Sequence, residues 1–264
     1  NNAKIKRDCF NIFFSFKNNI ETAFCLNQKL ITSLTHNNLN MKLHWLGIIG
    51  MFAAILGGLG DLLMLYNAEG GYEKQDYMFL MPISTWRVII GYYLGIIFIP
   101  LQLIGFGLVY HAIRPVGRKI TWPTIFMVVY ILIIGVVYHA MLGGLSQFMH
   151  LKKQTFIDAE LFQLTLNHYR MILEPISVVL YFSFIVAGMV LGYLIQTGKT
   201  AYPKWANLFN PLLMHLLFLG VYLVNKPIGS ALLITGLNFS LFILFLLSVL
   251  LFWNKTAKDF EMKV

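Results

Sequence analysis

The sequence predicts an all-α integral membrane bundle of six transmembrane helices. Of its 264 residues, 58% are hydrophobic and only 12% are charged, whereas soluble domains average about 25% charged residues. Six apolar stretches are each long enough, at about 20 residues, to cross a hydrocarbon core. All five tryptophans lie at the ends of these stretches, where indole rings prefer the membrane interface.

The six predicted helices follow one another without an internal repeat or a second domain. In order they are 44–66, 86–113, 122–149, 171–197, 205–225 and 228–253. Four tryptophans begin a helix and one ends the last helix: Trp45, Trp86, Trp122, Trp205 and Trp253. The first stretch is too long for a cleaved signal peptide, so we interpret it as a retained helix.

Basic residues in the connections predict the orientation. Arg114, Arg118 and Lys119 form the most asymmetric group, because no acidic residue balances them. By the positive-inside rule, this connection and both termini are expected to be cytoplasmic. The longest outer connection, 150–170, has apolar residues at helical spacing. It is expected to lie along the interface as an amphipathic helix or to form a partly ordered loop.

Residues 1–40 differ in composition from the rest of the chain, being rich in Asn, Lys, Phe and Ile without a sustained period. We expect Met41 to be the natural initiator and 1–40 to be a non-native or disordered extension, with a short genuine extension as the alternative. Residues 41–264 then form a single transmembrane domain. Both cysteines lie in the extension, so no disulfide or thiolate metal site is expected in the domain.

Asp61 is the most informative single residue, because a carboxylate near the centre of a spanning helix costs about 2.5–3.5 kcal/mol. Steps of three and four residues back from Asp61 reach small residues: Gly57, Ala54, Gly50 and Gly47. Small residues allow another helix backbone to approach closely. Asp61 is therefore expected to face the interior of the bundle.

The same periodicity places further polar residues on the small-residue faces of later helices. Because neighbouring helices alternate in direction, five polar residues are expected in the outer half of the bundle and a sixth at its floor: Asp61, Arg87, His139, Gln147, Glu174 and His215. We expect Arg87 to pair with Asp61 and keep it ionised. Glu174 and His139 are expected to contact a ligand.

Each of these residues also has a purely structural interpretation. An Asp61–Arg87 pair can simply fix how two helices pack. A single histidine such as His139 more often forms an interhelical hydrogen bond than a ligand contact. Glu174, followed by Pro175, suits the first turn of a helix. The coincidence of three ionisable groups at one depth favours a functional interpretation.

The leading hypothesis is an outward-facing intramembrane pocket that binds a small polar ligand or a lipid headgroup. A lipid-acting enzyme is one alternative, with Asp61, His139 and Glu174 as acid-base groups or weak candidate ligands of a divalent metal. A small proton-coupled transporter and a purely structural subunit are the others. The chain has no His-Glu-x-x-His motif, so no cofactor is expected, and whether the protein is an enzyme stays open.

The expected surroundings are a bacterial cytoplasmic membrane and its lipids. The formal net charge of +9 is explained by basic cytoplasmic loops, so no nucleic-acid partner is expected. Two small-residue pairs, Gly91 with Gly95 and Gly188 with Gly192, can serve contacts within one chain or between the chains of a homo-oligomer.

Four short features resemble a known family. They are Gly60-Asp61-Leu62-Leu63 at the end of the first helix, Arg87 with Gly91 and Gly95, Tyr138-His139, and Glu174-Pro175. The chain resembles, over about residues 44–250, a family of bacterial and fungal multi-pass membrane proteins catalogued as a domain of unknown function. The resemblance implies the helical membrane fold and carries no activity.

Overall fold

The structure, a computed structural model, describes residues 43–67, 75–154 and 158–260. The expected extension at 1–40 and its cysteines lie outside the described residues. Four of the described helices are long and apolar enough to cross a membrane. They are α2 (His44–Leu65), α3 (Thr85–Ile113), α4 (Arg118–Gln154) and α5 (Ala159–Gln196). These helices correspond to the first four predicted segments, within one residue at the ends of α2 and α5.

The C-terminal third differs from the prediction of two further straight crossings. It contains the short helices η3 (Lys204–Phe209), α6 (Pro211–Val224), α7 (Lys226–Ile234) and α8 (Gly236–Phe252). Helix α6 has only 14 residues. Helices α7 and α8 are bent by 73° and count together as one broken span. The structure therefore has four or five apolar helices that could span a membrane.

Asparagine and proline divide this region into short helices. The Asn210 side chain accepts a hydrogen bond from the Leu212 backbone N–H at 2.9 Å, and Pro211 occupies the first turn of α6. Asn225 does the same for α7, where its side chain accepts from the N–H of Ile228 at 3.2 Å. Asparagine caps followed by proline start helices. Hydropathy averaged over about 20 residues hides these breaks.

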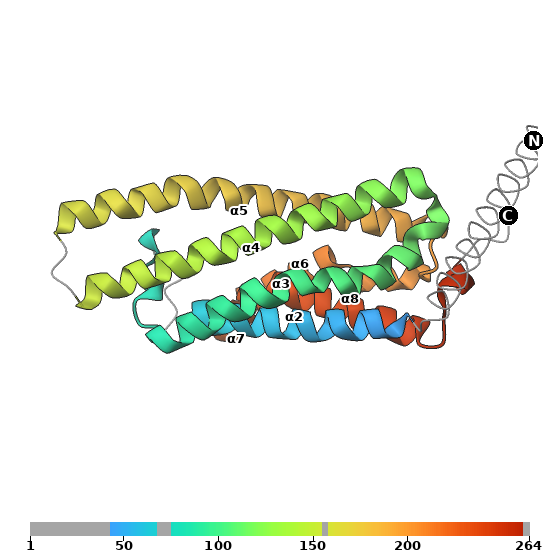
Figure 1. Ribbon diagram of the computed structural model, residues 1–264, viewed down its shortest axis with the longest axis horizontal. Coiled ribbons are helices and arrows are strands. Elements are labelled where there is room, and N and C mark those ends of the chain that lie inside the picture. Colours follow the sequence, from blue (N-terminus) through green and yellow to red (C-terminus); the bar gives the residue numbers. More distant parts are fainter. Residues whose placement is uncertain (1–42, 68–74, 155–157, 261–264) are drawn as a thin grey trace, which may run out of the picture.

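The long helices lie side by side, and α8 runs back along α2 (Figure 1). The start of α2 meets the end of α8, because the His44 ring stacks on Trp253 with centroids 4.3 Å apart. His44 Nδ1 also lies 2.8 Å from the Trp253 carbonyl oxygen. The two ends of the helical bundle therefore lie on the same side, which we call the terminal side.

The α4–α5 hairpin extends past α2 and α3 on the opposite side (Figure 1). These helices have 37 and 38 residues, which corresponds to about 55 Å each against a hydrocarbon core of about 30 Å. The far ends of the two helices replace the interfacial helix or loop that was expected at 150–170. Their facing aromatic rings hold them together, since Phe148 stacks on Phe162 at 5.2 Å.

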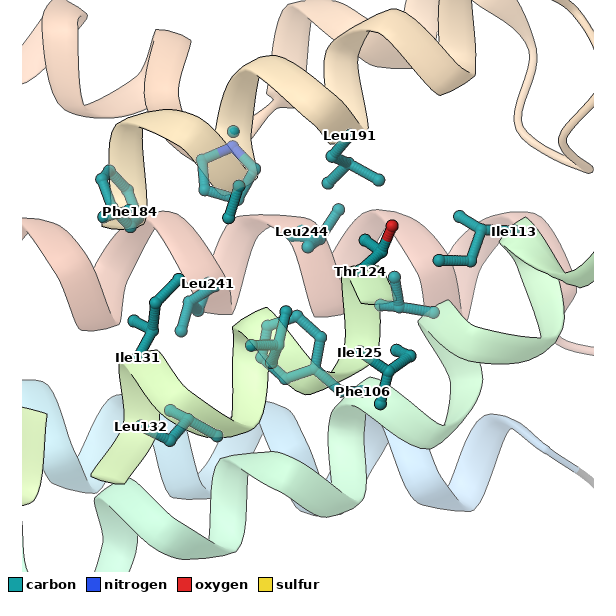
Figure 2. Close-up of a pocket in the computed structure, with 15 residues that line it drawn as sticks. Phe106, Ile113, Thr124, Ile125, Ile131, Leu132, Phe184, Leu191, Leu241 and Leu244 are labelled. Atoms are coloured by element: carbon teal, nitrogen blue, oxygen red, sulfur yellow. The ribbon is translucent and has the colours of Figure 1, made fainter. Parts of the chain in front are cut away.

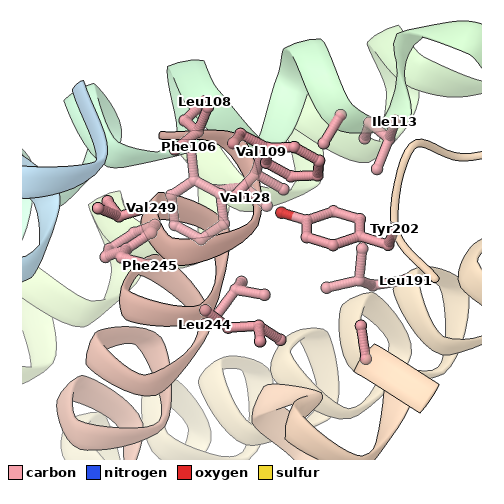
Figure 3. Close-up of a cluster of buried hydrophobic side chains, with 14 of the residues drawn as sticks. Phe106, Leu108, Val109, Ile113, Val128, Leu191, Tyr202, Leu244, Phe245 and Val249 are labelled. Carbon is pink, nitrogen blue, oxygen red and sulfur yellow. The ribbon is translucent and has the colours of Figure 1, made fainter. Parts of the chain in front are cut away.

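Two hydrophobic clusters hold the bundle together. The cluster near the terminal side joins α2, α3, α4, α5 and α8 with the loop after α5, through residues such as Phe106, Val128, Leu191, Tyr202 and Phe245 (Figure 3). The other cluster joins α2, α3, α4, α5 and the short helix η1 (Gln75–Leu80). The polar residues described below lie between these two clusters.

Glycines bring α2 and α3 into backbone contact. A Cβ atom on Gly50 would lie 2.4 Å from the Gly105 Cα atom, and a Cβ atom on Gly91 would lie 2.6 Å from the Gly60 carbonyl oxygen. The prediction that the small-residue face of the first helix is a packing surface is thus confirmed.

The two small-residue pairs considered for a homo-oligomer make contacts within one chain. A Cβ atom on Gly95 would meet the His139 ring. Cβ atoms on Gly188 and Gly192 would meet Leu212 and Asn207, respectively. These four glycines pack helices of the same chain together.

Candidate functional site

Asp61 joins three helices near the end of α2. Its Oδ1 atom lies 2.8 Å from His139 Nδ1 on α4, and its Oδ2 atom accepts a hydrogen bond from Asn238 Nδ2 on α8 at 2.6 Å. The Asp61 and His139 side chains are only 15% and 2% exposed. The prediction that Asp61 faces the bundle interior is therefore confirmed.

The hydrogen-bond chain continues onto α3 at both ends. His139 Nε2 lies 3.1 Å from the Gly91 carbonyl oxygen. Gln102 Nε2 donates to Asn238 Oδ1 at 2.5 Å, and Gln102 Oε1 is buried without a partner among the described residues. We call Gln102, Asn238, Asp61 and His139 the polar chain.

The geometry restricts the protons of the polar chain. A carbonyl oxygen only accepts hydrogen bonds, so His139 Nε2 must carry a proton. One further proton lies between His139 Nδ1 and Asp61 Oδ1, either on the ring as an imidazolium or on the carboxyl group. Both ring nitrogens are therefore engaged. His139 can act as a base or a metal ligand only after one of these hydrogen bonds breaks.

A cavity of about 290 Å³ lies beside the polar chain. Three tyrosines line it together with the polar chain: Tyr77, Tyr138 and Tyr181. Within the described part of the chain, the hydroxyls of Tyr138 and Tyr181 have no hydrogen-bond partner, so they are available to a ligand. Burial raises the pKa of Tyr77 and the nearby Glu174 carboxylate raises it further, which keeps this phenol neutral and able to donate.

Arg87 does not form the expected ion pair with Asp61. Its guanidinium donates instead to the carbonyl oxygens of Tyr66 at 2.8 Å and Leu62 at 3.2 Å. The Tyr66 carbonyl lies just beyond α2, and the Leu62 carbonyl, which also accepts the Tyr66 N–H at 3.0 Å, lies in its last turn. A positive charge is favourable at this end of a helix. Arg87 therefore caps α2, and the partners of Asp61 are His139 and Asn238.

Replacing Arg87 with glutamine is expected to lower the free energy of unfolding by about 1–3 kcal/mol, because two charge-assisted hydrogen bonds to the end of α2 are lost. Thermal unfolding of the purified protein in mild detergent measures this effect. Arg118→Gln, which changes an exposed arginine, is the matched control. Equal melting temperatures for the two variants would show that Arg87 does not cap α2.

Gln147, Glu174 and His215 lie outside the cavity lining. Gln147 lines a separate cavity between α3 and α4. Glu174 is 54% exposed and pairs with Arg170 Nε at 3.0 Å on its own helix. The His215 ring lies behind the cavity against Phe184, with centroids 5.7 Å apart.

Glu174 is not in the first turn of a helix, contrary to the expectation from Glu174-Pro175. Helix α5 starts about four turns earlier, at Ala159, where the Asp158 side chain accepts a hydrogen bond from the Leu161 N–H. Among the described residues, no three His, Cys, Asp or Glu side chains are grouped so that they could hold a metal ion. Asp61 and His139 therefore lack Glu174 as a third ligand.

Asn238 and the cavity tyrosines are functional candidates that sequence reasoning missed. Asn238 was detectable, because it is an amide in an apolar helix between two small residues, Gly236 and Ser240. Tyrosine is common in membrane proteins, and its sequence position does not reveal whether its hydroxyl meets lipid, water or a cavity.

The comparisons with known proteins concern the whole bundle. No curated protein and no solved structure matches the chain. The model of a family described as a family of unknown function (DUF6796) matches residues 31–255. This match includes every helix from α2 to α8 and confirms the resemblance to a domain of unknown function. The chain therefore belongs to the DUF6796 family.

Proposed function

We propose that this protein is a multi-pass membrane protein that binds a small polar ligand or a lipid headgroup in the cavity beside Asp61. The observation that carries the proposal is the cavity of about 290 Å³ beside the polar chain. Tyr138 and Tyr181 line it, and their hydroxyls make no hydrogen bond to any residue that the structure describes. Polar side chains inside a membrane are costly and usually functional. A polar cluster that only fixed helix packing would need no cavity.

Binding explains the polar chain better than catalysis does. His139 makes two hydrogen bonds, to Asp61 and to the Gly91 carbonyl oxygen, so its ring is held in place with neither nitrogen free. Such a ring orients Asp61 and shapes a binding surface. A general base must instead reach the proton that it removes.

We further propose six crossings, with α6 as a short fifth one, in a bacterial cytoplasmic membrane with both termini inside. An even number of crossings agrees with the contact between His44 and Trp253. The basic connection after α3 lies on the terminal side, since His111 packs against Phe260 at 6.2 Å. By the positive-inside rule that side is cytoplasmic, so the cavity lies in the outer half of the membrane.

Filling the cavity tests the proposed function. Leu237 lines the cavity on α8, and Leu237→Trp is expected to remove a co-purified small molecule that native mass spectrometry detects on the wild-type protein. Leu250→Trp is the matched control, because Leu250 is exposed on the same helix. The same bound mass in the wild type and in Leu237→Trp, or no bound mass in any sample, would contradict the proposal.

A further inference from the structure

The cavity has a polar end and an apolar end. The polar chain and the tyrosines form the polar end. Away from them, the lining consists of apolar side chains such as Ile131, Leu132, Phe184 and Leu241. A ligand that fills the whole cavity must therefore carry an apolar part as well as a polar one.

A second, narrower cavity of about 50 Å³ continues from the apolar end. The two cavities share four lining residues: Ile131, Leu132, Phe184 and Leu241. In Figure 2 these four gather at one end of the narrow cavity, and Leu191 and Ile113 lie towards the other. Its polar lining residue, Thr124, already donates to the Ile120 carbonyl oxygen at 2.9 Å. The extension is therefore apolar, and its volume of about 50 Å³ suits the end of a hydrocarbon chain.

The charges at the polar end disfavour an anionic ligand. Among the described lining residues, Asp61 is acidic and none is a lysine or arginine. Arg87 donates to backbone carbonyls of α2. Because Asp61 and His139 share one proton, the pair carries no net charge, so a phosphate or carboxylate group would enter the cavity without a net positive charge to balance it. Among the described residues, the lining groups without a hydrogen-bond partner that face the cavity are the Tyr138 and Tyr181 hydroxyls, which suit an uncharged ligand with hydroxyl groups.

The cavity also reaches the apolar surface of the bundle. Tyr181 lines the cavity, yet it is 39% exposed, and its neighbours Val178 and Phe182 are exposed as well. In a membrane this face of α5 contacts lipid. Tyr181 therefore separates the cavity from this lipid-facing surface.

We infer that the ligand is a single-chain amphiphile with an uncharged, hydroxylated headgroup, of which a monoacylglycerol is the simplest example. The headgroup lies against the tyrosines, and the chain runs between Leu132 and Leu241 so that its end enters the narrow extension. This inference rests on the proposed function and names the chemical class of the ligand.

Native mass spectrometry of the full chain in mild detergent tests the inference with four probes: 1-monooleoylglycerol, oleoyl lysophosphatidate, dioleoylglycerol and glycerol. The monoacylglycerol is expected to bind about tenfold more tightly than either other acyl probe. Leu241→Trp, at the junction of the two cavities, is expected to weaken it by about tenfold or more. Met189→Phe, on the exposed face of α5, is the control and should bind like the wild type.

The remaining outcomes separate the two proposals. In one outcome, glycerol binds as tightly as the monoacylglycerol, in a way that depends on Tyr138 and is unchanged in Leu241→Trp. That result would overturn the inference and leave the proposed function standing. Tighter binding of the lysophosphatidate would overturn the claim that the headgroup is uncharged. Tighter binding of the diacylglycerol would overturn the claim that the ligand has a single chain. Failure of every probe to bind, with no co-purified molecule in the cavity-filling experiment, would overturn both proposals.

Discussion

Replacing His139 with alanine is expected to lower the free energy of unfolding by about 3–5 kcal/mol, because it leaves a buried carboxyl group without its main partner. Asp61 Oδ1 and the Gly91 carbonyl oxygen both lose the imidazole. The deletion also leaves a void, since the ring packs directly against Gly95. Unfolding in detergent, followed by circular dichroism against temperature or denaturant, measures the loss.

A double-mutant cycle separates the paired interaction from lost packing. Once Asp61 is replaced by asparagine, removal of His139 no longer leaves a buried carboxyl group without its partner, so the second substitution should cost clearly less than it does in the wild type. His168→Ala, which changes an exposed histidine on α5, should be close to neutral. Strictly additive costs for Asp61 and His139 would show that the two side chains do not stabilise each other.

Replacing Gly50 with alanine is expected to cost about 1–3 kcal/mol or more, because the new Cβ atom overpacks the crossing of α2 and α3. The nearest atom is the Gly105 Cα atom at 2.4 Å, with Phe245 Cδ2 at 3.1 Å behind it. A backbone atom cannot rotate away as a flexible side chain can. The two helices must therefore separate, which also disturbs the hydrophobic cluster on the terminal side.

Gly220 offers the same substitution without a neighbour. A Cβ atom on Gly220 would meet nothing within 4 Å, and alanine has the higher helix propensity by about 1 kcal/mol. Gly220→Ala should therefore be neutral or slightly stabilising under the same unfolding conditions. A Gly50→Ala variant as stable as Gly220→Ala would show that the close approach of α2 and α3 does not occur.

The pairing of polar groups shows where periodicity stops being informative. Helical spacing correctly placed Asp61 and His139 on inward faces, because both share a face with glycines that let backbones approach. It could not choose the partner of Asp61. Arg87 has a long side chain whose guanidinium reaches the carbonyl oxygens of Leu62 and Tyr66 at the end of α2, whereas Asn238 approaches from a helix far along the chain.

Composition and hydropathy alone determined the class of this protein, since apolar stretches of helical length have few other stable arrangements. Periodicity alone determined which face of α2 is packed and that Asp61 points inward. Only the tertiary structure decided that Arg87 caps α2, that Glu174 stays outside the cavity, and that Asn238 completes the polar chain. The physical reason is that hydrophobicity and helical spacing are local properties of the chain, whereas a hydrogen-bond partner depends on how separate helices cross.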